Sequence, residues 1–552
     1  MLIFLDRLGA ATMFAATEAR SCFPCFDEPH FKAIFALEVT VDPHLMVISN
    51  MPIMDSDFDK SRQKRKDHFE WSKEMSTYLV CIVIGQYEFV QTRANHNRTI
   101  VRVFAPYGQR EHGRFSLEVA KKSLEFFNHY FGKRYPLPKL DLVALNRLSV
   151  GAMENWGLIT CRENALIVNP SDANPSTLRK IATLVAHEIS HQWFGNLVTM
   201  KWWDFLYLNE GFATFMQYLC INAIYPEFEV FNEFSTETFV PALGMDALEH
   251  THAVEMPLLD ASEISQVFDK ITYCKGASVI YMLHQFIGAE NFRNGIREYI
   301  QHFSYGNADT DDLWLFMSKA SGIDVANLMN SWIREIGFPV VRVSTLRTPE
   351  HEETGKITLK LTQQRFCGGE ANGYKRGMVW SIPVQGLYMK NGQILEKFEL
   401  LFDKKSTTVE LEGYDLNDPN CWLKLNPKLT GFYRVQYSED LFSSLFANLS
   451  SAHLTSIDRM GLFDDQVAMV QTETGSTVRL LKMAQHFSEY ERSYTVWRAV
   501  MGVLHLIRSL TWDIEEVADK LDQFCQGILR PFLDELGFIT LSNESSNDRY
   551  NF

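Results

Sequence analysis

The spacing of hydrophobic and polar residues divides the chain into regions of different secondary structure. Between residues 31 and 90 apolar residues recur at every second position, which is typical of strands that bury one face. From about Ser116 they recur every three or four positions instead, and this helical pattern continues to Trp332. Two short apolar segments inside the helical region, 141–144 and 157–160, are expected to form strands.

A second β region begins after the turn signal formed by Gly337, Phe338 and Pro339. Five short apolar segments follow at regular spacing, with Gly, Asn and Asp residues between them, and this pattern predicts a small β-sandwich. The segments are 340–346, 356–364, 381–389, 395–402 and 407–413. Beyond about Tyr437 the period is helical again. The order of β, α, β and α regions predicts an α+β multidomain protein.

The length and composition of the chain narrow the classes of function. The chain has 552 residues, of which 46% are hydrophobic and 22% charged, and this suits three or four globular domains. Its formal net charge of −15 makes nucleic acid a poor candidate partner, because nucleic-acid binders need clustered positive charge. The same acidic balance favours ligands that carry an amine, if part of the negative charge lines a cleft.

The sequence also predicts the compartment of the protein. No apolar run approaches the ~20 residues that a membrane helix needs, so no membrane span is expected. The apolar start of the chain is interrupted by Asp6 and Arg7 and does not resemble a secretory signal. The nine cysteines are an odd number without framework spacing, which suits reduced thiols. We therefore expect a cytoplasmic protein.

The strongest chemical signal is the H-E-x-x-H motif that contains His187, Glu188 and His191. Two histidines four residues apart lie on the same face of a helix, so both imidazoles reach one zinc ion, and Glu188 beside them can hold a water against it. An apolar stripe before the motif supports the helix, and Ser176 after Pro175 is its expected N-cap. The motif predicts a zinc site on a helix.

A third zinc ligand is expected, because a catalytic zinc usually takes three protein ligands and keeps its fourth position for water. Glu210 is the candidate, since it begins a second helical run that would bring its carboxylate opposite the two histidines. Taken alone, Glu210 would be better explained as a first-turn carboxylate that the helix dipole favours. The motif upstream makes the ligand interpretation the better one.

Several motifs together resemble one known family. Glu210 follows His191 after eighteen intervening residues, and the segment 151–157 reads GAMENWG. This pattern is similar to that of the gluzincin aminopeptidases of the M1 family, and the similarity extends from about Ala10 to about Gly537. It includes the motifs at 23–29, 191–200, 208–213 and 273–280.

The resemblance implies a fold of four parts. Residues 1–95 would form a partial N-terminal β-saddle, 96–336 a thermolysin-like, mainly α zinc catalytic domain, 337–432 the β-sandwich, and 433–552 the start of a C-terminal α-helical solenoid. Because members of the family are considerably longer, the chain is expected to be truncated at both ends. Truncated domain faces favour self-association or partner binding, since strand edges and an apolar stacking face stay unpaired.

The resemblance also implies a zinc metallo-aminopeptidase that hydrolyses the N-terminal bond of peptides with a free N-terminus. His187, His191 and Glu210 would hold one Zn²⁺ per chain, and Glu188 would act as general base toward the zinc-bound water. Tyr273 matches the family tyrosine that stabilises the tetrahedral intermediate by hydrogen bonding. Without the surrounding match, Tyr273 would be better explained as a core residue of an amphipathic helix.

The GAMEN segment supplies the substrate-binding residues that the resemblance implies. They are Gly151, Ala152, Met153, Glu154 and Asn155. Glu154 would bind the free α-amino group of the substrate, which makes the enzyme an exopeptidase. The backbone around Gly151 and Ala152 would pair with the substrate in the manner of an added strand.

Two positions depart from the family pattern. Where the family has a Gln in the first substrate pocket and a Glu as second carboxylate for the amine, this chain has Met13 and Ala15. Losing that carboxylate removes a charge-assisted contact of ~1.5 to 3 kcal/mol, which weakens binding by about one to two decades. A second hypothesis therefore stays open, a catalytically impaired or inactive paralogue with a binding or regulatory role. The epoxide-hydrolase activity of one branch of the superfamily is a less close match.

Overall fold

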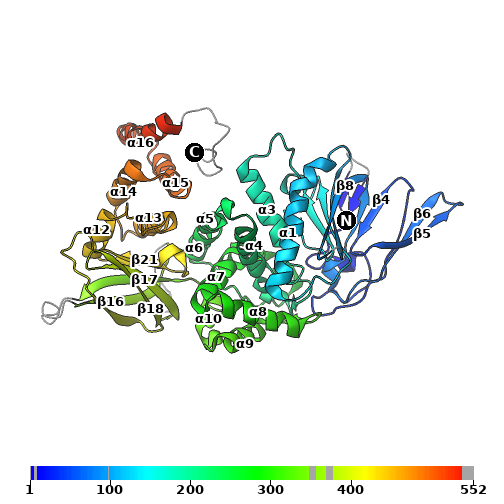
Figure 1. Cartoon of the computed structure of the whole chain (residues 1–552), viewed down its shortest axis with the longest axis horizontal. Coiled ribbons are helices and arrows are strands. Elements are labelled where there is room, and N and C mark those ends of the chain that lie inside the picture. Colours follow the sequence, from blue (N-terminus) through cyan, green and yellow to red (C-terminus); the bar gives the residue numbers. More distant parts are fainter. Residues whose placement is uncertain (1, 5–8, 97, 347–355, 369–376, 537–552) are drawn as a thin grey trace. The chain divides into compact units, whose positions relative to one another are not determined.

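The computed structural model describes residues 2–4, 9–96, 98–346, 356–368 and 377–536 (Figure 1). Internal contacts divide the chain into two compact units. Within the described ranges, the first comprises Met1–Phe231 and Val254–Ala326, and the second comprises Asn232–Ala253 and Asn327–Phe552. The limits of the four predicted domains stay predictions, and residues 537–552 of the last one lie outside the described part.

The first unit begins with antiparallel strands, as the period-two pattern predicts. One sheet has the order β1-β2-β7-β4 and a second the order β3-β6-β5. The strands are β1 (Leu2–Phe4), β2 (Gly9–Ala11), β3 (Glu38–Val41), β4 (Met46–Ser49), β5 (Ile53–Asp59), β6 (Lys64–Phe69) and β7 (Ile82–Gly85). Ala11, Ile48 and Val83 of the first sheet share a hydrophobic cluster with Phe104 and Val143. The predicted β-rich N-terminal region is confirmed.

A five-stranded sheet follows, with the order β11-β12-β10-β9-β8. Its strands are β8 (Tyr87–Ala94), β9 (Thr99–Pro106), β10 (Lys139–Leu145), β11 (Ala152–Met153) and β12 (Leu158–Arg162). Strands β9, β10 and β12 are parallel, whereas β8 and β11 run antiparallel at the two edges. The two strands predicted inside the helical region are β10 and β12, so that prediction is confirmed.

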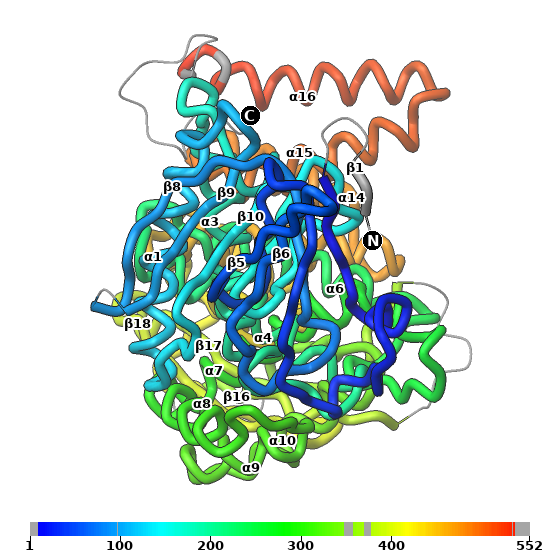
Figure 2. The backbone as a smooth tube through the Cα atoms, turned by 90° about the vertical axis from the view of Figure 1, so that its right-hand side faces the viewer, coloured from blue at the N-terminus to red at the C-terminus, as the bar shows by residue number. Residues whose placement is uncertain are grey.

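Helices form most of the remainder of the first unit. They are α1 (Arg114–Phe131), α2 (Glu163–Leu166), α3 (Pro175–Ser190), α4 (Glu210–Ile224), α7 (Gly276–Ile287), α8 (Ala289–Phe303) and α9 (Thr310–Ser321). α1 buries Leu117, Leu124 and Phe127 and packs against β8, β9 and α3 (Figure 2). α3 packs against α4, and α4 packs against α7. A short parallel pair, β13 (Thr199–Met200) and β14 (Asn307–Ala308), lies among these helices in sequence. The predicted, mainly helical catalytic region is confirmed.

The second unit contains the two sheets of the predicted sandwich. One sheet has the order β19-β16-β15-β21 and the other the order β18-β17-β20. The strands are β15 (Pro339–Leu346), β16 (Lys356–Arg365), β17 (Ile382–Lys390), β18 (Ile394–Phe402), β19 (Ser406–Glu412), β20 (Leu423–Leu425) and β21 (Arg434–Tyr437). The first five are the five predicted segments, whereas β20 and β21 were not predicted, since three or four residues are too few to show a period.

Helices complete the second unit. They are α6 (Val240–Asp246), α12 (Glu439–Ala447), α13 (Ser456–Gln471), α14 (Thr477–Tyr490), α15 (Tyr494–Leu510) and α16 (Glu515–Leu536), while α5 (Val230–Glu233) and α10 (Val325–Ile333) span its sequence limits. The predicted C-terminal helical region is confirmed. In the part of the chain that is described, no helix combines the length and the apolar character that crossing a bilayer requires. The nine cysteines all lie in the described ranges, and none of them is in a disulfide bond there.

Candidate metal centre and substrate cavities

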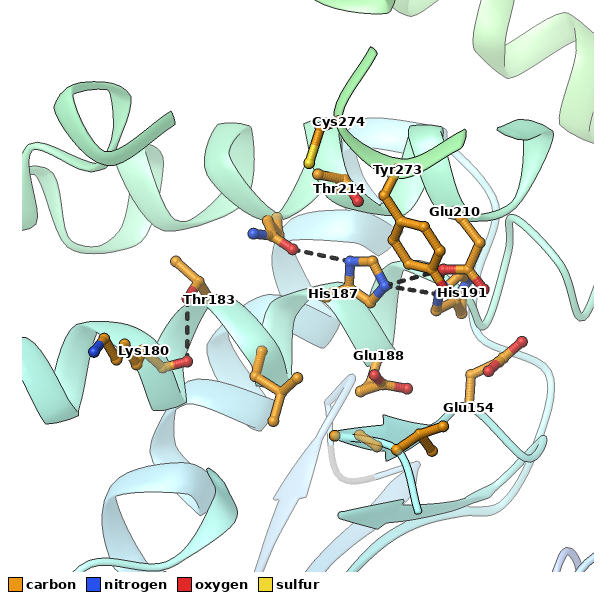
Figure 3. A pocket seen from close by; sticks show the side chains of 15 residues that line it. Glu154, Lys180, Thr183, His187, Glu188, His191, Glu210, Thr214, Tyr273 and Cys274 are labelled. Atoms are coloured by element: carbon orange, nitrogen blue, oxygen red, sulfur yellow. Dashed lines mark hydrogen bonds and ion pairs between the residues drawn. The ribbon is translucent and has the colours of Figure 1, made fainter. Parts of the chain in front are cut away.

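Three predicted ligands converge at one point of the first unit. His187 lies in the last turn of α3, His191 is the C-cap residue directly after that helix, and Glu210 is the first residue of α4. The two Nε2 atoms are 3.0 Å apart, and Glu210 Oε2 lies 3.4 Å from that of His187 and 3.3 Å from that of His191 (Figure 3). Within the described ranges, His, Cys, Asp and Glu side chains form one group of three whose ligand atoms are close enough to share a metal ion, and this trio is that group.

The helix that leads into the two histidines begins two residues earlier than predicted. The N-cap is Asn174, whose side-chain oxygen accepts a hydrogen bond from the Thr177 backbone N–H at 2.8 Å, and Pro175 occupies the first helical position. The prediction of Ser176 as N-cap is therefore wrong. Proline is well suited to the first turn, because its missing N–H would have no partner there, so the cap precedes it.

The Nδ1 atoms of the two imidazoles, which face away from this point, also make hydrogen bonds. His187 Nδ1 lies 2.9 Å from Gln217 Oε1, and His191 Nδ1 lies 3.0 Å from the carbonyl oxygen of Phe194. Since an oxygen of this kind only accepts, each Nδ1 donates, and each neutral ring then presents a lone pair at Nε2. Two lone pairs and a carboxylate oxygen at one point form a donor set that fits a zinc ion.

The charged groups around this point also favour a bound cation. Burial disfavours a charged His191, yet Glu210 and Glu154 outweigh it and raise the pKa of His191 to about 10. Burial alone would raise the pKa of Glu210, but His191 and His187 hold it well below its usual range. The carboxylates therefore favour positive charge between the two histidines, as a divalent metal would supply.

Glu188 lies beside the cluster and lines the same cavity. Its residue is 4% exposed, and its Oε2 has no hydrogen-bond partner among the described residues. Burial raises the pKa of Glu188 well above its usual range, and Glu154 and Glu210 add to the effect while His191 opposes it. A carboxylate with a raised pKa and a free oxygen is suited to take up and release a proton near neutral pH.

Tyr273 lies on the other side of the cluster, in a π-helical turn (Ile271–Lys275) directly before α7. Its ring is nearly parallel to that of His187, with centroids 6.4 Å apart. Burial and the nearby Glu210 raise the pKa of Tyr273 well above its usual value, so the hydroxyl stays protonated as a donor. A Cβ added to Gly211 would lie 3.2 Å from backbone atoms of Thr272 and Gly276, and this close approach brings α4 against the turn that carries Tyr273.

The predicted substrate-binding residues lie on and next to the edge strand β11. Ala152 and Met153 pair with β12, and no described strand pairs with the other edge of β11. Gly151, Ala152 and Glu154 line the cavity that also contains the metal cluster of His187, His191 and Glu210. Met153 lines a second cavity that shares residues with the first. Asn155 lines neither cavity, and its fully buried amide has no hydrogen-bond partner among the described residues.

Glu154 is the acidic group that both cavities share with Glu210. Its residue is 7% exposed, and burial raises the pKa of its carboxyl, an effect that His191 opposes and Glu210 reinforces. Apart from these charges, its carboxylate accepts a hydrogen bond from its own backbone N–H, and no lysine or arginine pairs with it in the described ranges. It is thus a buried carboxylate open to a cation from the cavity.

A second cavity of about 430 Å³ adjoins the first, which has a similar volume. The two share Val150, Ala152, Glu154, Glu210 and Tyr273. The walls of the second cavity also include Met13 and Ala15, so the two departures from the family pattern line the same cavity as Glu154 and Tyr273. Its other large apolar lining residues include Trp203, Leu206, Ile264 and Phe268.

Gln217 is a functional residue that the sequence analysis missed. It follows Glu210 by seven residues on α4, which places both on one face of the helix, two turns apart. That spacing is the signal that would have identified it. The Phe194 carbonyl carries no such signal, because a backbone oxygen has no residue type.

Comparison with known families gives three matches. The Peptidase M1 N-terminal domain matches residues 6–79, the Peptidase family M1 domain matches residues 115–332, and the ERAP1-like C-terminal domain matches residues 422–551. The second match contains the whole metal cluster, Glu154, Glu188 and Tyr273.

Curated proteins of similar sequence cover almost all of this chain. Aminopeptidase M1-A of Oryza sativa subsp. japonica is 37% identical over 542 residues, which is 98% of this chain and 60% of that protein. Puromycin-sensitive aminopeptidase of Caenorhabditis elegans is 35% identical over 544 residues, 98% of this chain and 56% of that protein. Aminopeptidase 2, mitochondrial, of Saccharomyces cerevisiae is 36% identical over 540 residues, 97% of this chain and 54% of that protein. The chain thus spans little more than half the length of these relatives.

Proposed function

Because the chain belongs to the M1 peptidase family, we propose that it is a zinc metallo-aminopeptidase, which hydrolyses the peptide bond after the N-terminal residue of a peptide. The observation that carries this proposal is the Glu154 carboxylate, which is buried beside the metal cluster without a basic partner among the described residues. A substrate ammonium at Glu154 would place the first peptide bond against the cluster. An internal peptide bond offers no such charge.

One zinc ion would be held by His187 Nε2, His191 Nε2 and Glu210 Oε2. When bound there, zinc polarises a carbonyl oxygen and lowers the pKa of a water toward neutrality. Gln217 and the Phe194 carbonyl keep the two histidines in the tautomer that presents Nε2.

Glu188 would move the proton during hydrolysis. Its free Oε2 takes a proton from the attacking water, and the same oxygen then gives it to the nitrogen of the leaving amine. The raised pKa of Glu188 suits both steps, because the carboxyl must hold the proton between them.

Tyr273 would donate a hydrogen bond to the oxygen of the scissile carbonyl as negative charge develops there. Its hydroxyl remains protonated at neutral pH, and its position beside His187 places it at the edge of the cluster. The free edge of β11 would hold the substrate backbone as an added strand, with Gly151 and Ala152 at the cavity wall.

The amine contact is tested with the variant Glu154→Gln, which keeps the shape of the side chain and removes its charge. We expect KM for an aminoacyl amide with a free amine to rise by about tenfold or more, because a charge-assisted contact is lost. Steady-state kinetics of each protein with the free and the N-acetylated substrate measure this effect. Equal cleavage of the two substrates by the unmodified protein would refute the exopeptidase assignment.

A catalytically impaired paralogue is the second candidate function, and the residues that favour it are Met13 and Ala15 in the second cavity. Restoring the acid with Ala15→Glu tests it. We expect KM for the free-amine substrate to fall about tenfold, since a second carboxylate then faces the ammonium. Gln63→Glu adds the same charge at the exposed turn between β5 and β6 and serves as control. An unchanged KM in Ala15→Glu would mean that the amine site tolerates the loss.

Peptides with a free N-terminus are the proposed partners. The exclusion of nucleic acid and the self-association through truncated domain faces rest on the sequence alone and stay predictions. The cytoplasmic location also stays a prediction, and one similar protein is named as mitochondrial.

A further inference from the structure

The cavity of the metal cluster carries opposite charges at its two ends. Glu154 lies at one end and Lys180 at the other, with His187, Glu188 and His191 between them (Figure 3). Both end residues line the cavity. The proposed reaction uses the acidic end and leaves the basic end without a role.

Lys180 lies on α3, the helix that carries His187 and has His191 as its C-cap residue. It precedes His187 by seven residues on α3, which is nearly two full turns, so both side chains project from the same face. With a rise of 1.5 Å per residue, the two positions are about 10 Å apart along the helix axis. This spacing separates the two backbone positions. The Lys180 side chain extends away from the cluster in Figure 3, so its flexible stem has to turn back toward His187 to meet a group at this distance.

The ammonium of Lys180 is available to a ligand. Its backbone carbonyl accepts a hydrogen bond from the Thr183 hydroxyl at 3.1 Å, which ties the main chain and not the side chain. Among the described residues no carboxylate forms an ion pair with Lys180, and the residue is exposed at the cavity wall. Thr183, Leu184 and Gln217 line the same cavity, and none of them carries a charge.

We infer that Lys180 binds a carboxylate on the leaving side of the substrate, an inference that rests on the proposed function. With the N-terminal ammonium at Glu154 and the first peptide bond at the cluster, the rest of the peptide has to extend past His187 toward Lys180. A carboxylate there is the group that an unpaired ammonium attracts. The cavity is thus complementary to a short zwitterionic peptide.

The spacing sets the length of the preferred peptide. An extended chain advances about 3.3 to 3.6 Å per residue, so about 10 Å corresponds to about three residues after the scissile bond. The flexible stem of lysine allows the ammonium to meet a carboxylate one residue nearer. The substrate class is therefore tripeptides and tetrapeptides with a free C-terminus, or longer peptides with an acidic side chain at the same distance.

The test compares tetra-alanine with its C-terminal amide in the zinc-loaded full chain. We expect KM to be about fivefold lower for the free acid, because a partly exposed ion pair contributes up to about that factor. Lys180→Gln removes the difference between the two substrates, and Lys180→Arg keeps it. Lys60→Gln, at an exposed position outside both cavities, also keeps it. An acid-to-amide ratio that is the same in Lys180→Gln as in the unmodified chain would overturn the inference.

Two further experiments complete the test. The first distinguishes a C-terminal carboxylate from a side-chain carboxylate, and the second distinguishes failure of this inference from failure of the proposed function. An amidated pentapeptide with Asp three residues after the scissile bond tests the side-chain source, and its advantage over the Asn analogue has to vanish in Lys180→Gln. Peptide binding to the zinc-loaded Glu188→Gln chain, measured by calorimetry, requires no turnover. Tighter binding of the acid than of the amide that depends on Lys180 supports the inference even if hydrolysis is absent. Equal binding of acid and amide contradicts it.

Discussion

Glu188→Gln is expected to lower the turnover of a free-amine peptide by at least about 10³-fold while leaving the metal content unchanged. Proton transfer by a positioned carboxylate contributes factors of this size, and the amide of glutamine cannot take up the proton from water. No hydrogen bond joins Glu188 to the imidazole nitrogens that would hold the metal, so we expect zinc affinity to be preserved. Steady-state kinetics and zinc analysis on the same sample measure the two quantities.

The matched control for this variant is Glu125→Gln on α1. Glu125 is exposed, lines neither cavity, and loses the same charge on substitution. Its turnover is expected to equal that of the unmodified chain. If Glu188→Gln retained more than a tenth of the turnover in a folded, zinc-loaded sample, Glu188 would not be the general base.

His191→Ala is expected to abolish zinc binding at stoichiometric concentration and to lower turnover at least about 10³-fold. The substitution removes one of the three proposed ligands. The zinc ion that these ligands would hold acts as a Lewis acid, and such an ion supplies several kcal/mol of charge stabilisation in the transition state. The substitution also leaves the buried Glu210 with one imidazole in place of two. Zinc titration with a chromophoric competitor, followed by the peptide assay, measures both effects.

His284→Ala is the control for this second variant. His284 is also a buried histidine, on α7, but its contacts include the rings of Phe215 and Phe292, and it lines neither cavity. We expect it to retain one zinc ion per chain. If His191→Ala still bound one zinc ion per chain and kept full turnover, the catalytic zinc site would have to lie elsewhere in the chain.

The convergence of His187, His191 and Glu210 was predictable because their geometry is local or nearly so. His187 and His191 are brought together by one helical turn, whatever the rest of the fold does. Glu210 required a tertiary contact between α3 and α4, and the sequence indicated it only through the start of a helix. The five longer strands of the sandwich were predicted for the same local reason, a clear period over seven or more residues.

Other features depend on contacts that no local pattern records. Tyr273 lies in a π-helical turn, where the backbone departs from the period that identifies an amphipathic helix. Ala15 and Glu154 line the same second cavity, although the two are far apart in sequence. The charged ends of the first cavity likewise combine Lys180 on α3 with Glu154 next to β11.

The most direct test of the central claim measures amino-acid release from one peptide with a free N-terminus by the full chain. The unmodified protein and Glu188→Gln are compared at equal zinc content, with and without a chelator. The account predicts release of the N-terminal residue by the unmodified protein alone, loss of that release with chelator, and its return when zinc is added back. A folded, zinc-loaded protein that releases no residue faster than Glu188→Gln would contradict the account.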